Sequence, residues 1–560
     1  MASKLGVVSF ALSLALLACS GPARFPLREP LREDDDQRPI ARAPEEYYSP
    51  FAWDGANQMV FRPIARFFAV DPAGAAANVN AFDEVPNSSW FENRLGTRPM
   101  SAEEVARGGC DDKVLDPNMP DGSWVIDKGK TNGANPGFRV NIPGLGKFML
   151  KTDPESEPDR ATGATAIASR VYHAVGYHAP CDSVVYFRPS LLKLEPGLTV
   201  TNNQGVTRPF DQAELERVLR TASHRNGLVR MVASKWLPGK PLGPYRYEGT
   251  RDDDPNDVIP HEDRRELRGG RLVSAWLNHF DSREQNTMDV FMPLDPDRKD
   301  GPGYVRHYII DMGDCFGSVW AEDGISRRLG HSYVFDATHV AEDFVTFGAV
   351  ERPWERAKRL GGIFNYFSAR DFDPEAWHGE YQNPSFLRMR EGDGAWMARI
   401  LASFDDELVR AAVRVGQYDA ASEHYLAETL IQRRDAILRR YLARVSPIAR
   451  VEATRTGVCG VDLARATGVV PNEGSSFRAR LFRGEALAET RGHRFARVAS
   501  PRVCVDVPHL ELEGIPDHDA RRYVVVEITN GYAEGPLRAH LYDLGAARGY
   551  RLAGIERPEP

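Results

Sequence analysis

The sequence predicts an α+β protein in which strand-rich and helix-rich segments follow one another along the chain. Three observations support this class. Short strand-like runs bounded by turn residues cluster over residues 124–151, a helical period of apolar residues dominates from about residue 255 to 445, and short strands return from about residue 450. With 42% hydrophobic residues over 560, the chain can build two or three packed domains.

The N-terminus has the pattern of a signal peptide. Lys4 precedes the apolar run Leu5–Ala18, which is too short to span a bilayer stably and ends in Leu16-Leu17-Ala18-Cys19. This ending resembles the lipobox of bacterial lipoproteins, which implies that the Cys19 thiol carries a lipid after residues 1–19 are processed. The alternative is a plain secretory signal with a free Cys19. Either way we expect an exported protein, and the lipobox implies a cell-envelope location, anchored to a membrane.

Two segments precede the first predicted domain. Residues 20–50 include Pro26, Pro30, Pro39 and Pro44, the acidic run Glu33–Asp36 and few apolar groups, which predicts a disordered linker. Residues 51–120 are expected to form an N-terminal extension. It includes the loop-like aromatic stretch Asp83–Arg94, and Ser101 and Glu104 have the spacing of a capping box.

Charge and cysteine content exclude some classes of function. The formal net charge of −8 argues against a nucleic-acid-binding face. None of the cysteines lies in a C-x-x-C spacing, so a structural zinc site is not expected. Cys459 and Cys504 fall in one C-terminal region of an exported chain and can form a disulfide. Apart from Cys19 the count is odd, which leaves at least one free thiol.

The first domain begins with a predicted antiparallel meander. Strand-like runs occupy residues 124–128, 137–142 and 147–151, and the turn-rich stretch 129–136 joins the first two. An Ala-rich helix is expected over 161–175, with Gly176 as its stop. A strand at 183–187 has a later partner at 228–236.

Helical periodicity then takes over. One face of a helix from about residue 262 to 279 collects Leu267, Leu272, Val273, Trp276, Leu277 and Phe280, which we interpret as core packing. Strands are expected at 287–292 and 304–310, and helices to about 445. Residues 448–560 read as a small C-terminal β-sandwich-like domain, clearest at 523–528 and 539–542.

The stretch that indicates chemistry lies between this helix and the second strand. It reads His279-Phe-Asp-Ser-Arg-Glu-Gln-Asn286. A predicted hairpin follows, and after it comes Ile309-Ile-Asp-Met-Gly-Asp-Cys-Phe-Gly317. The pattern resembles the protein-kinase-like superfamily, whose catalytic loop has the form H-R-D-x-x-x-x-N and whose metal site has the form D-F-G. Phosphoryl transfer needs a carboxylate beside the attacking hydroxyl and oxygen ligands for Mg²⁺.

This resemblance implies a two-lobed domain that binds ATP and Mg²⁺. Its N-lobe, with a small antiparallel sheet, would span residues 121–240 and its helical C-lobe residues 241–447. Asp281 would be the catalytic base, and Asn286 and Asp311 would hold the metal.

The N-lobe would supply the nucleotide contacts. Lys151 would contact the α- and β-phosphates, and the hairpin tip with Lys130 and Gly133 would cover them. Asp159 is the expected acidic partner of Lys151, with Glu155 and Glu157 as alternatives. The run Ala233–Gly239 would supply the hinge for adenine.

More closely, the run resembles the atypical branch that includes HipA-like, spore-coat CotH-like, Fam20-like and phosphatidylinositol kinases. Ile309–Gly317 is similar to the I-D-x-G-x-x-F-G of the last two groups. The layout also resembles an uncharacterised family of bacterial exported proteins, with Ser88–Arg94, Asp254–Asp257 and Gln432–Asp435 as its marks. Together these resemblances cover roughly residues 80–445.

Two functions of different classes remain open. The first is phosphoryl or adenylyl transfer to a hydroxyl of an unknown protein, lipid or glycan acceptor. The second is a non-catalytic, pseudokinase-like binding or scaffold lipoprotein, because Phe280 replaces the arginine of H-R-D and residues 129–137 lack G-x-G-x-x-G. An exported bacterial protein also meets little ATP.

Other polar groups have a structural and a functional interpretation. Asp252–Asp254 with Asp257 form either a solvated acidic loop or a Ca²⁺ or Mg²⁺ site. His261, Arg264 and Arg265 either pair with that loop or reach phosphates. His279 is expected to brace the catalytic loop instead of carrying a proton.

Overall fold

The chain divides into two units, which are described here separately. The computed structural model describes residues 24–69, 74–111, 115–130, 135–201, 206–298, 301–319, 323–360, 362–471, 477–484, 486–490, 494–495 and 497–560. The larger unit holds residues 32–78 and 85–441, and the smaller unit holds residues up to 31, 79–84 and 442–560. Helices and several small antiparallel sheets are both present, so the predicted α+β class is confirmed. Signal-peptide residues 1–19 and Cys19 lie outside the described residues.

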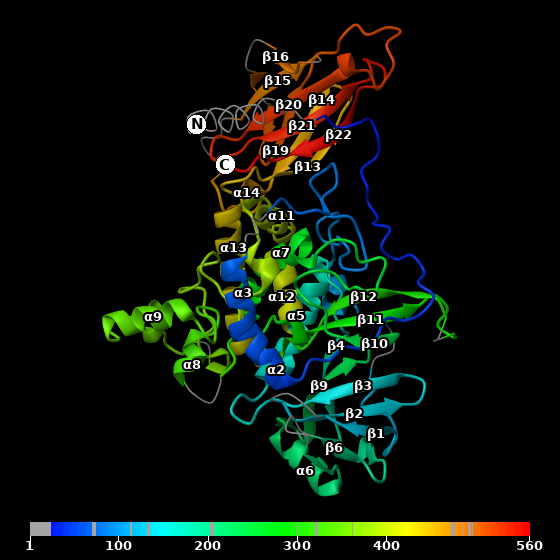
Figure 1. Ribbon diagram of the computed structural model, residues 1–560, viewed down its shortest axis with the longest axis vertical. Helices are drawn as coiled ribbons and strands as arrows, with labels where there is room; N and C mark the ends of the chain where they lie inside the picture. Colours follow the sequence, from blue (N-terminus) through cyan, green and yellow to red (C-terminus); the bar gives the residue numbers. More distant parts are fainter. Residues whose placement is uncertain are drawn as a thin grey trace, which may run out of the picture. The chain divides into compact units, whose positions relative to one another are not determined.

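The larger unit contains a sheet with the strand order β4-β9-β3-β2-β1-β5 (Figure 1). The predicted meander is present as β1 (Trp124–Gly129), β2 (Gly137–Ile142) and β3 (Gly146–Lys151), paired antiparallel in sequence. The strand β9 (Leu228–Lys235) lies between β3 and β4 (Asp182–Phe187), so the long-range partner predicted for β4 is also confirmed.

Alternating side chains explain why these runs form strands. In β3 the buried Phe148 and Leu150 alternate with partly or fully exposed residues, which is the period of a half-buried strand. The buried sides of β1, β2, β3 and β9 form one apolar cluster with Leu215 and Val218 of α6 (Gln212–Thr221). Smaller strands complete this region: β5 (Leu192–Leu194), β6 (Thr199–Thr201), β7 (Thr207–Pro209) and β8 (His224–Arg225).

Helix α5 (Arg160–Val175) follows β3, as predicted, and is buried along nearly its whole length. Its small residues permit close packing: a Cβ on Gly163 would lie 2.3 Å from the ring of Tyr418. The helix ends at Gly176, which has a φ of 127°. Glycine adopts this backbone conformation without strain, whereas other residues do not. The predicted helix stop is therefore confirmed.

His173 in the last turn of α5 makes stability depend on pH. Burial and the nearby Arg94, Arg170 and Arg107 lower the pKa of His173 to about 3. The unfolded chain therefore takes up a proton below about pH 6.5 that the folded chain does not. We expect this histidine to lower the free energy of unfolding by about 1.4 kcal/mol per pH unit as pH falls from roughly 6 to 4.

Urea denaturation at several pH values checks this expectation. His173→Gln should flatten the acid limb of the stability curve, and His224→Gln is the matched control because that side chain is exposed. Equal pH slopes for wild type and His173→Gln would contradict the expectation.

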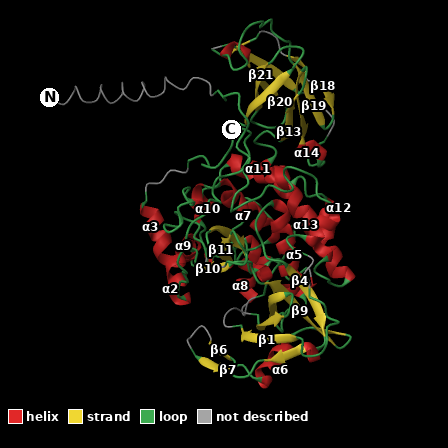
Figure 2. Cartoon of the chain, turned by 90° about the vertical axis from the view of Figure 1, so that its right-hand side faces the viewer, coloured by secondary structure: helices red, strands yellow, loops and turns green. Residues whose placement is uncertain are grey.

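The remainder of the larger unit combines helices, loops and a second small sheet. Helix α7 (Arg265–Leu277) is buried among α10 (Pro384–Leu387), α11 (Glu391–Leu401) and α13 (Ala420–Tyr441), so its apolar stripe is core packing as predicted (Figure 2). A second sheet has the order β10-β11-β12, with β10 (Lys240–Gly243), β11 (Thr287–Pro293) and β12 (Gly303–Ile309). The two predicted strands after α7 are thus β11 and β12.

Other helices of this unit are short. The α-helices are α2 (Phe51–Ala56), α3 (Arg62–Phe68), α4 (Ala102–Arg107), α8 (Asp323–Arg328), α9 (Ala337–Thr346) and α12 (Asp406–Arg414), and a π-helix joins α2 to α3 at Asn57–Phe61. The 3₁₀ helices are Pro189–Leu191, His261–Asp263, Glu284–Asn286, Met312–Asp314, Pro353–Arg356 and Gly362–Phe364. The capping box predicted at Ser101 and Glu104 starts α4.

Residues 24–50 do not form the disordered linker that the sequence predicts for 20–50. The Asp36 carboxylate accepts hydrogen bonds from the backbone N–H and the hydroxyl of Ser89. Ile40 forms a β-bridge with Gly303 and is buried with Leu242 and other apolar residues. Such a segment has no core of its own, but contacts with residues far away in the sequence hold it in place. Its composition does not reveal these contacts.

The smaller unit is a two-layer β structure, as predicted. One sheet holds β13 (Ile448–Ala453), β14 (Gly457–Asp462), β18 (Arg497–Ala499) and β19 (Arg502–Asp506). The other holds β15 (Arg478–Arg483), β16 (Ala488–Glu489), β17 (Arg494–Phe495), β20 (Tyr523–Thr529), β21 (Leu537–Asp543) and β22 (Tyr550–Glu556), and α14 (Leu463–Ala466) and a 3₁₀ turn at Ala520–Arg522 lie between strands. Apolar side chains of both sheets, such as Val503 and Val526, share one core.

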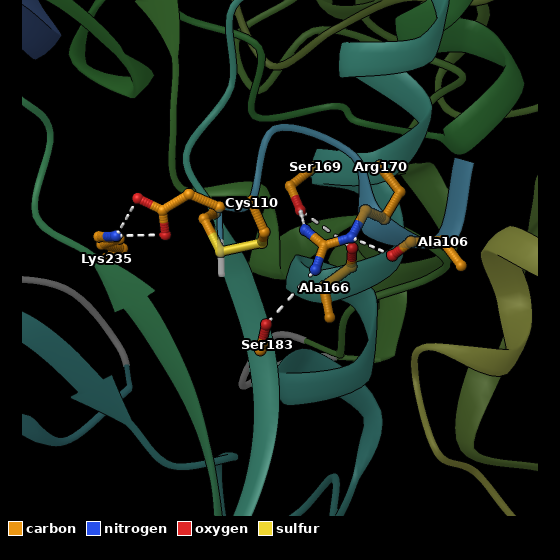
Figure 3. Close-up of a disulfide and its surroundings, with 9 residues drawn as sticks. Ala106, Cys110, Ala166, Ser169, Arg170, Ser183 and Lys235 are labelled. Atoms are coloured by element: carbon orange, nitrogen blue, oxygen red, sulfur yellow. Dashed lines mark hydrogen bonds and ion pairs between the residues drawn. A yellow bond between two sulfur atoms is a disulfide. The ribbon is translucent and has the colours of Figure 1, made fainter. Parts of the chain in front are cut away.

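The cysteines agree with the sequence analysis and add one bond. Cys459 and Cys504 face each other across β14 and β19 and form the predicted disulfide. A second disulfide, not predicted, joins Cys110 to Cys181 (Figure 3). Cys315 is a buried free thiol, which fits the odd count. Within the described ranges, no helix has the length and apolarity needed to cross a membrane.

Candidate active site

The stretch His279–Asn286, in which the sequence predicts a catalytic loop, begins where α7 ends. Asn278 adopts a left-handed conformation after Leu277, which stops the helix and turns the chain toward Asp281. The Nδ2 of Asn286 then donates to the Asp281 Oδ2 and to the Asp281 carbonyl oxygen, both at 2.7 Å. The five-residue spacing noted in the sequence therefore corresponds to a closed, buried loop.

The Asp281 carboxylate lies in an unusual electrostatic setting. Burial raises its pKa well above the ordinary value, Arg283 opposes the shift, and the nearby Glu380 carboxyl adds to it. Arg283 links the two acids, with its Nε 2.8 Å from Asp281 Oδ1 and its Nη1 3.3 Å from Glu380 Oε2. A buried carboxyl with a raised pKa takes up a proton more readily than a solvated aspartate, which is what a general base requires.

The second pair is formed by Lys151 and Asp311. Lys151 Nζ lies 2.6 Å from Asp311 Oδ1, and this ammonium group holds the pKa of the Asp311 carboxyl well below its usual range. Asp311 is half-exposed and has a φ of 55°, a conformation that costs energy in a residue other than glycine. Strained backbone of this kind is commonly found at functional sites.

Lys130 places a second positive group beside this pair. Its Nζ donates to the carbonyl oxygen of Asn135, and burial together with Lys151 lowers its pKa to about 8. Asp311, Asp314 and Asp182 all act on one or both of these lysines, so the site holds charges of both signs. The lysines can bind an anion such as phosphate where a divalent cation offsets the carboxylates.

The two pairs meet at one end of the β11–β12 hairpin. Thr287, directly after Asn286, pairs with Ile309, and the Ile310 N–H donates to the Asn286 carbonyl oxygen at 2.9 Å. His279 is close enough to Asp311 to affect its pKa. The two pairs, Asp281 with Asn286 and Lys151 with Asp311, therefore lie near the same end of this hairpin.

His279 behaves as the predicted brace. Its ring is fully buried and its Nδ1 lies 2.9 Å from the hydroxyl of Tyr172 on α5. Burial lowers the pKa of His279 to about 4, so the ring is neutral near pH 7.

The start of α5 holds the loop after Asp311. The buried Arg160 donates to the carbonyl oxygens of Gly313 and Cys315, both at 2.9 Å, and to Glu157 Oε2. Glu157 Oε1 in turn accepts from the Val319 N–H at 2.7 Å and from Asn365. This network connects the region after β3 to the D-x-G loop.

The prediction that Asp159 is the acidic partner of Lys151 is wrong. Asp159 lies 3.3 Å from Arg230 and 3.8 Å from Arg225, and its φ of 68° places it in a left-handed turn before α5. Those arginines on β8 and β9 neutralise Asp159, whereas Lys151 pairs with Asp311. The alternative Glu157 pairs with Arg160. Gly133, expected to contact phosphate, lies outside the described residues.

Asp182 is a site residue that the sequence analysis missed. It is buried at the start of β4, next to the disulfide cysteine Cys181. Burial raises its pKa to about 6, and Ser234 and Lys151 oppose the shift. No sequence signal marks this residue, because an aspartate at a strand start is commonplace and only the pairing of β4 with β9 brings it toward Lys151.

The acidic loop and the basic residues after it are structural. Asp257 lies 2.7 Å from His261 and 3.4 Å from Arg264, as the structural interpretation predicts, whereas Arg265 pairs with Asp393. Asp254 and Asp257 are buried, so the loop is not fully solvated as expected. In the part of the chain that the structure describes, no group of three His, Cys, Asp or Glu side chains is arranged to hold a metal ion.

The residues present nevertheless fit a nucleotide with one divalent cation. Asp311 offers a partly exposed carboxylate, and Asn286 retains its Oδ1 because its Nδ2 faces Asp281. Lys130 and Lys151 supply the positive charge that a triphosphate requires.

Comparisons with known proteins place the chain in no group. No family model matches it, and neither a curated protein nor a solved structure shows significant similarity.

Proposed function

We propose that this chain is an exported, lipid-anchored protein with a kinase-like domain that transfers phosphate from ATP to a hydroxyl group. The observation that carries the proposal is the meeting of Lys151, Asp281, Asn286 and Asp311, which are distant in sequence, as two hydrogen-bonded pairs at one end of the β11–β12 hairpin. The order of lysine strand, α5, β4, β9, α7 and catalytic loop agrees with the resemblance.

The proposed roles follow from the geometry. Lys151 and Lys130 would bind the phosphates, and Asn286 and Asp311 would hold Mg²⁺, which would neutralise charge on the transferred group. The acceptor oxygen forms a bond to the γ-phosphorus while the bond from that phosphorus to the bridging oxygen breaks. Asp281 takes the hydroxyl proton, and ADP leaves with the electron pair of the broken bond.

The disulfides support export. The chain holds two disulfides, Cys110–Cys181 and Cys459–Cys504, and such bonds persist in oxidising compartments. Figure 3 shows the first of them beside the ion pair that Lys235 makes with Asp111. The lipid on Cys19 rests on the sequence pattern of residues 4–19.

A non-catalytic binding function is the second candidate. It is favoured by the contact of Lys151 with Asp311 in place of a carboxylate on α5, and by the engagement of Asp281 with Arg283. In that case the site binds a partner or a nucleotide without turnover.

Nucleotide binding is tested by thermal unfolding of the full chain carrying Cys19→Ser, with ATP, Mg²⁺, or both. A hundredfold excess of nucleotide over its Kd should raise the free energy of unfolding by about 2.7 kcal/mol. Lys151→Ala should remove the shift, and Lys147→Ala is the matched control, because Lys147 lies on the same strand and also pairs with an aspartate, Asp127, at 3.5 Å.

Two outcomes would contradict the proposal. One is the absence of a shift with any nucleotide, and the other is a shift that survives both Lys151→Ala and Asp311→Ala. ATP labelled on the γ- or the α-phosphate then separates phosphoryl from adenylyl transfer. Binding without transfer of either label would favour the second candidate.

A further inference from the structure

A cavity of about 560 Å³ lies beside the N-terminal helical segment of the larger unit. One wall comes from the π-helix and α3. The opposite wall comes from residues 333–339 and 378–382. The apolar lining residues are Met59, Val60, Pro63, Ile64, Phe67, Phe68 and Phe335.

The lining changes from polar to apolar along the helical run. Gln58 is 4% exposed and its Nε2 donates to Glu284 Oε2, whereas Phe67 and Phe68 are 83% and 77% exposed. Ten residues of helix separate Gln58 from Phe68, about 15 Å. The cavity therefore has a buried polar end and an open apolar end.

The polar end adjoins the candidate active site. Gln58 and Arg62 both contact Glu284, which lies in the loop between Asp281 and Asn286. On the opposite wall Glu380 lines the cavity and connects through Arg283 to Asp281.

We infer that this cavity binds the acceptor, and that the acceptor is an amphiphile with a hydroxyl-bearing head and a hydrocarbon chain. The head lies toward Glu380 and Asp281, and the chain lies along Ile64, Phe67 and Phe68. This inference rests on the proposed function for the transfer step. Burying each methylene of the hydrocarbon chain would raise the affinity by up to about fourfold. The exposed aromatic side chains of the cavity would supply the apolar surface for this burial.

Binding is tested first without nucleotide. The full chain carrying Cys19→Ser is titrated with 1-hexanol, 1-octanol and 1-decanol, which displace the fluorescent probe 1-anilinonaphthalene-8-sulfonate. Affinity should rise by up to about fourfold per methylene. Affinity that is independent of chain length, or no displacement, would overturn the inference.

Two phenylalanines provide a matched pair of variants. Phe67 and Phe344 are each 83% exposed, but only Phe67 lines the cavity. Phe67→Ser should weaken 1-decanol binding at least tenfold, whereas Phe344→Ser should leave it unchanged. Equal effects of the two substitutions would mean non-specific adsorption and would also overturn the inference.

Turnover then separates this inference from the proposed function. With ATP, Mg²⁺ and the same alcohols, transfer of the γ-label should increase with chain length and fall in Phe67→Ser. Chain-length-dependent binding without transfer would support the cavity as a site and refute the phosphotransfer role. A nucleotide-dependent thermal shift without alcohol binding would support the nucleotide site and refute the cavity as a binding site for the acceptor.

Discussion

Replacing Arg160 by leucine is expected to lower the free energy of unfolding by about 3–5 kcal/mol. Arg160 is fully buried, pairs with the buried Glu157 and donates to two carbonyl oxygens of the loop after Asp311. Its removal leaves a buried carboxylate without its cation and backbone acceptors without their donor, and both are costly. Urea denaturation of both proteins at pH 7 measures the difference.

The chain provides a close control for this substitution. Arg217 also pairs with a glutamate three residues earlier, Glu214, but its side chain is 46% exposed. Arg217→Leu should therefore cost less than about 1 kcal/mol, as surface ion pairs do. If the two leucine variants lost similar stability, the buried network would not hold the loop in the way described.

Replacing Asp281 by asparagine is expected to reduce kcat for phosphoryl transfer by a factor of about 10²–10⁴, the usual contribution of a general base. Asparagine has nearly the same shape but does not accept the acceptor's proton. The nucleotide-dependent thermal shift should persist, because the phosphates are assigned to Lys130 and Lys151. Initial rates over a range of ATP concentrations separate kcat from KM.

The control for Asp281→Asn is Asp371→Asn. Asp371 is a half-exposed carboxylate that pairs with the neighbouring Arg370, away from the catalytic loop in sequence. It should keep the wild-type kcat. A full kcat in Asp281→Asn would remove Asp281 from the role of base, even if the nucleotide still bound.

Local patterns predicted the main elements between residues 124 and 310. The meander of β1–β3, helix α5 with its Gly176 stop, and the hairpin β11–β12 each follow from side-chain period and turn residues within one segment. The order of these elements also pointed to the candidate site, because Lys151, Asp281, Asn286 and Asp311 each stand at the end of an element. The bonds Lys151–Asp311 and Asp281–Asn286 agree with that expectation.

Side-chain partners that come from distant segments of the chain could not be predicted from the sequence. Asp159 was expected beside Lys151, but Arg225 and Arg230 reach it from β8 and β9. Asp182 and Glu380 carry no local signal, and their roles depend on strand pairing and on a loop far along the chain.

By itself the sequence predicted the main strands and helices between residues 124 and 310 and which polar residues stand at their ends, since these depend on spacing over a few residues. Only the tertiary structure decided which charges neutralise each other, that residues 24–50 are ordered, and that a cavity lies beside Glu380, which Arg283 links to Asp281. The physical reason is that desolvation and ion pairing depend on the whole set of neighbours in space, and most of those neighbours here are far apart in the chain.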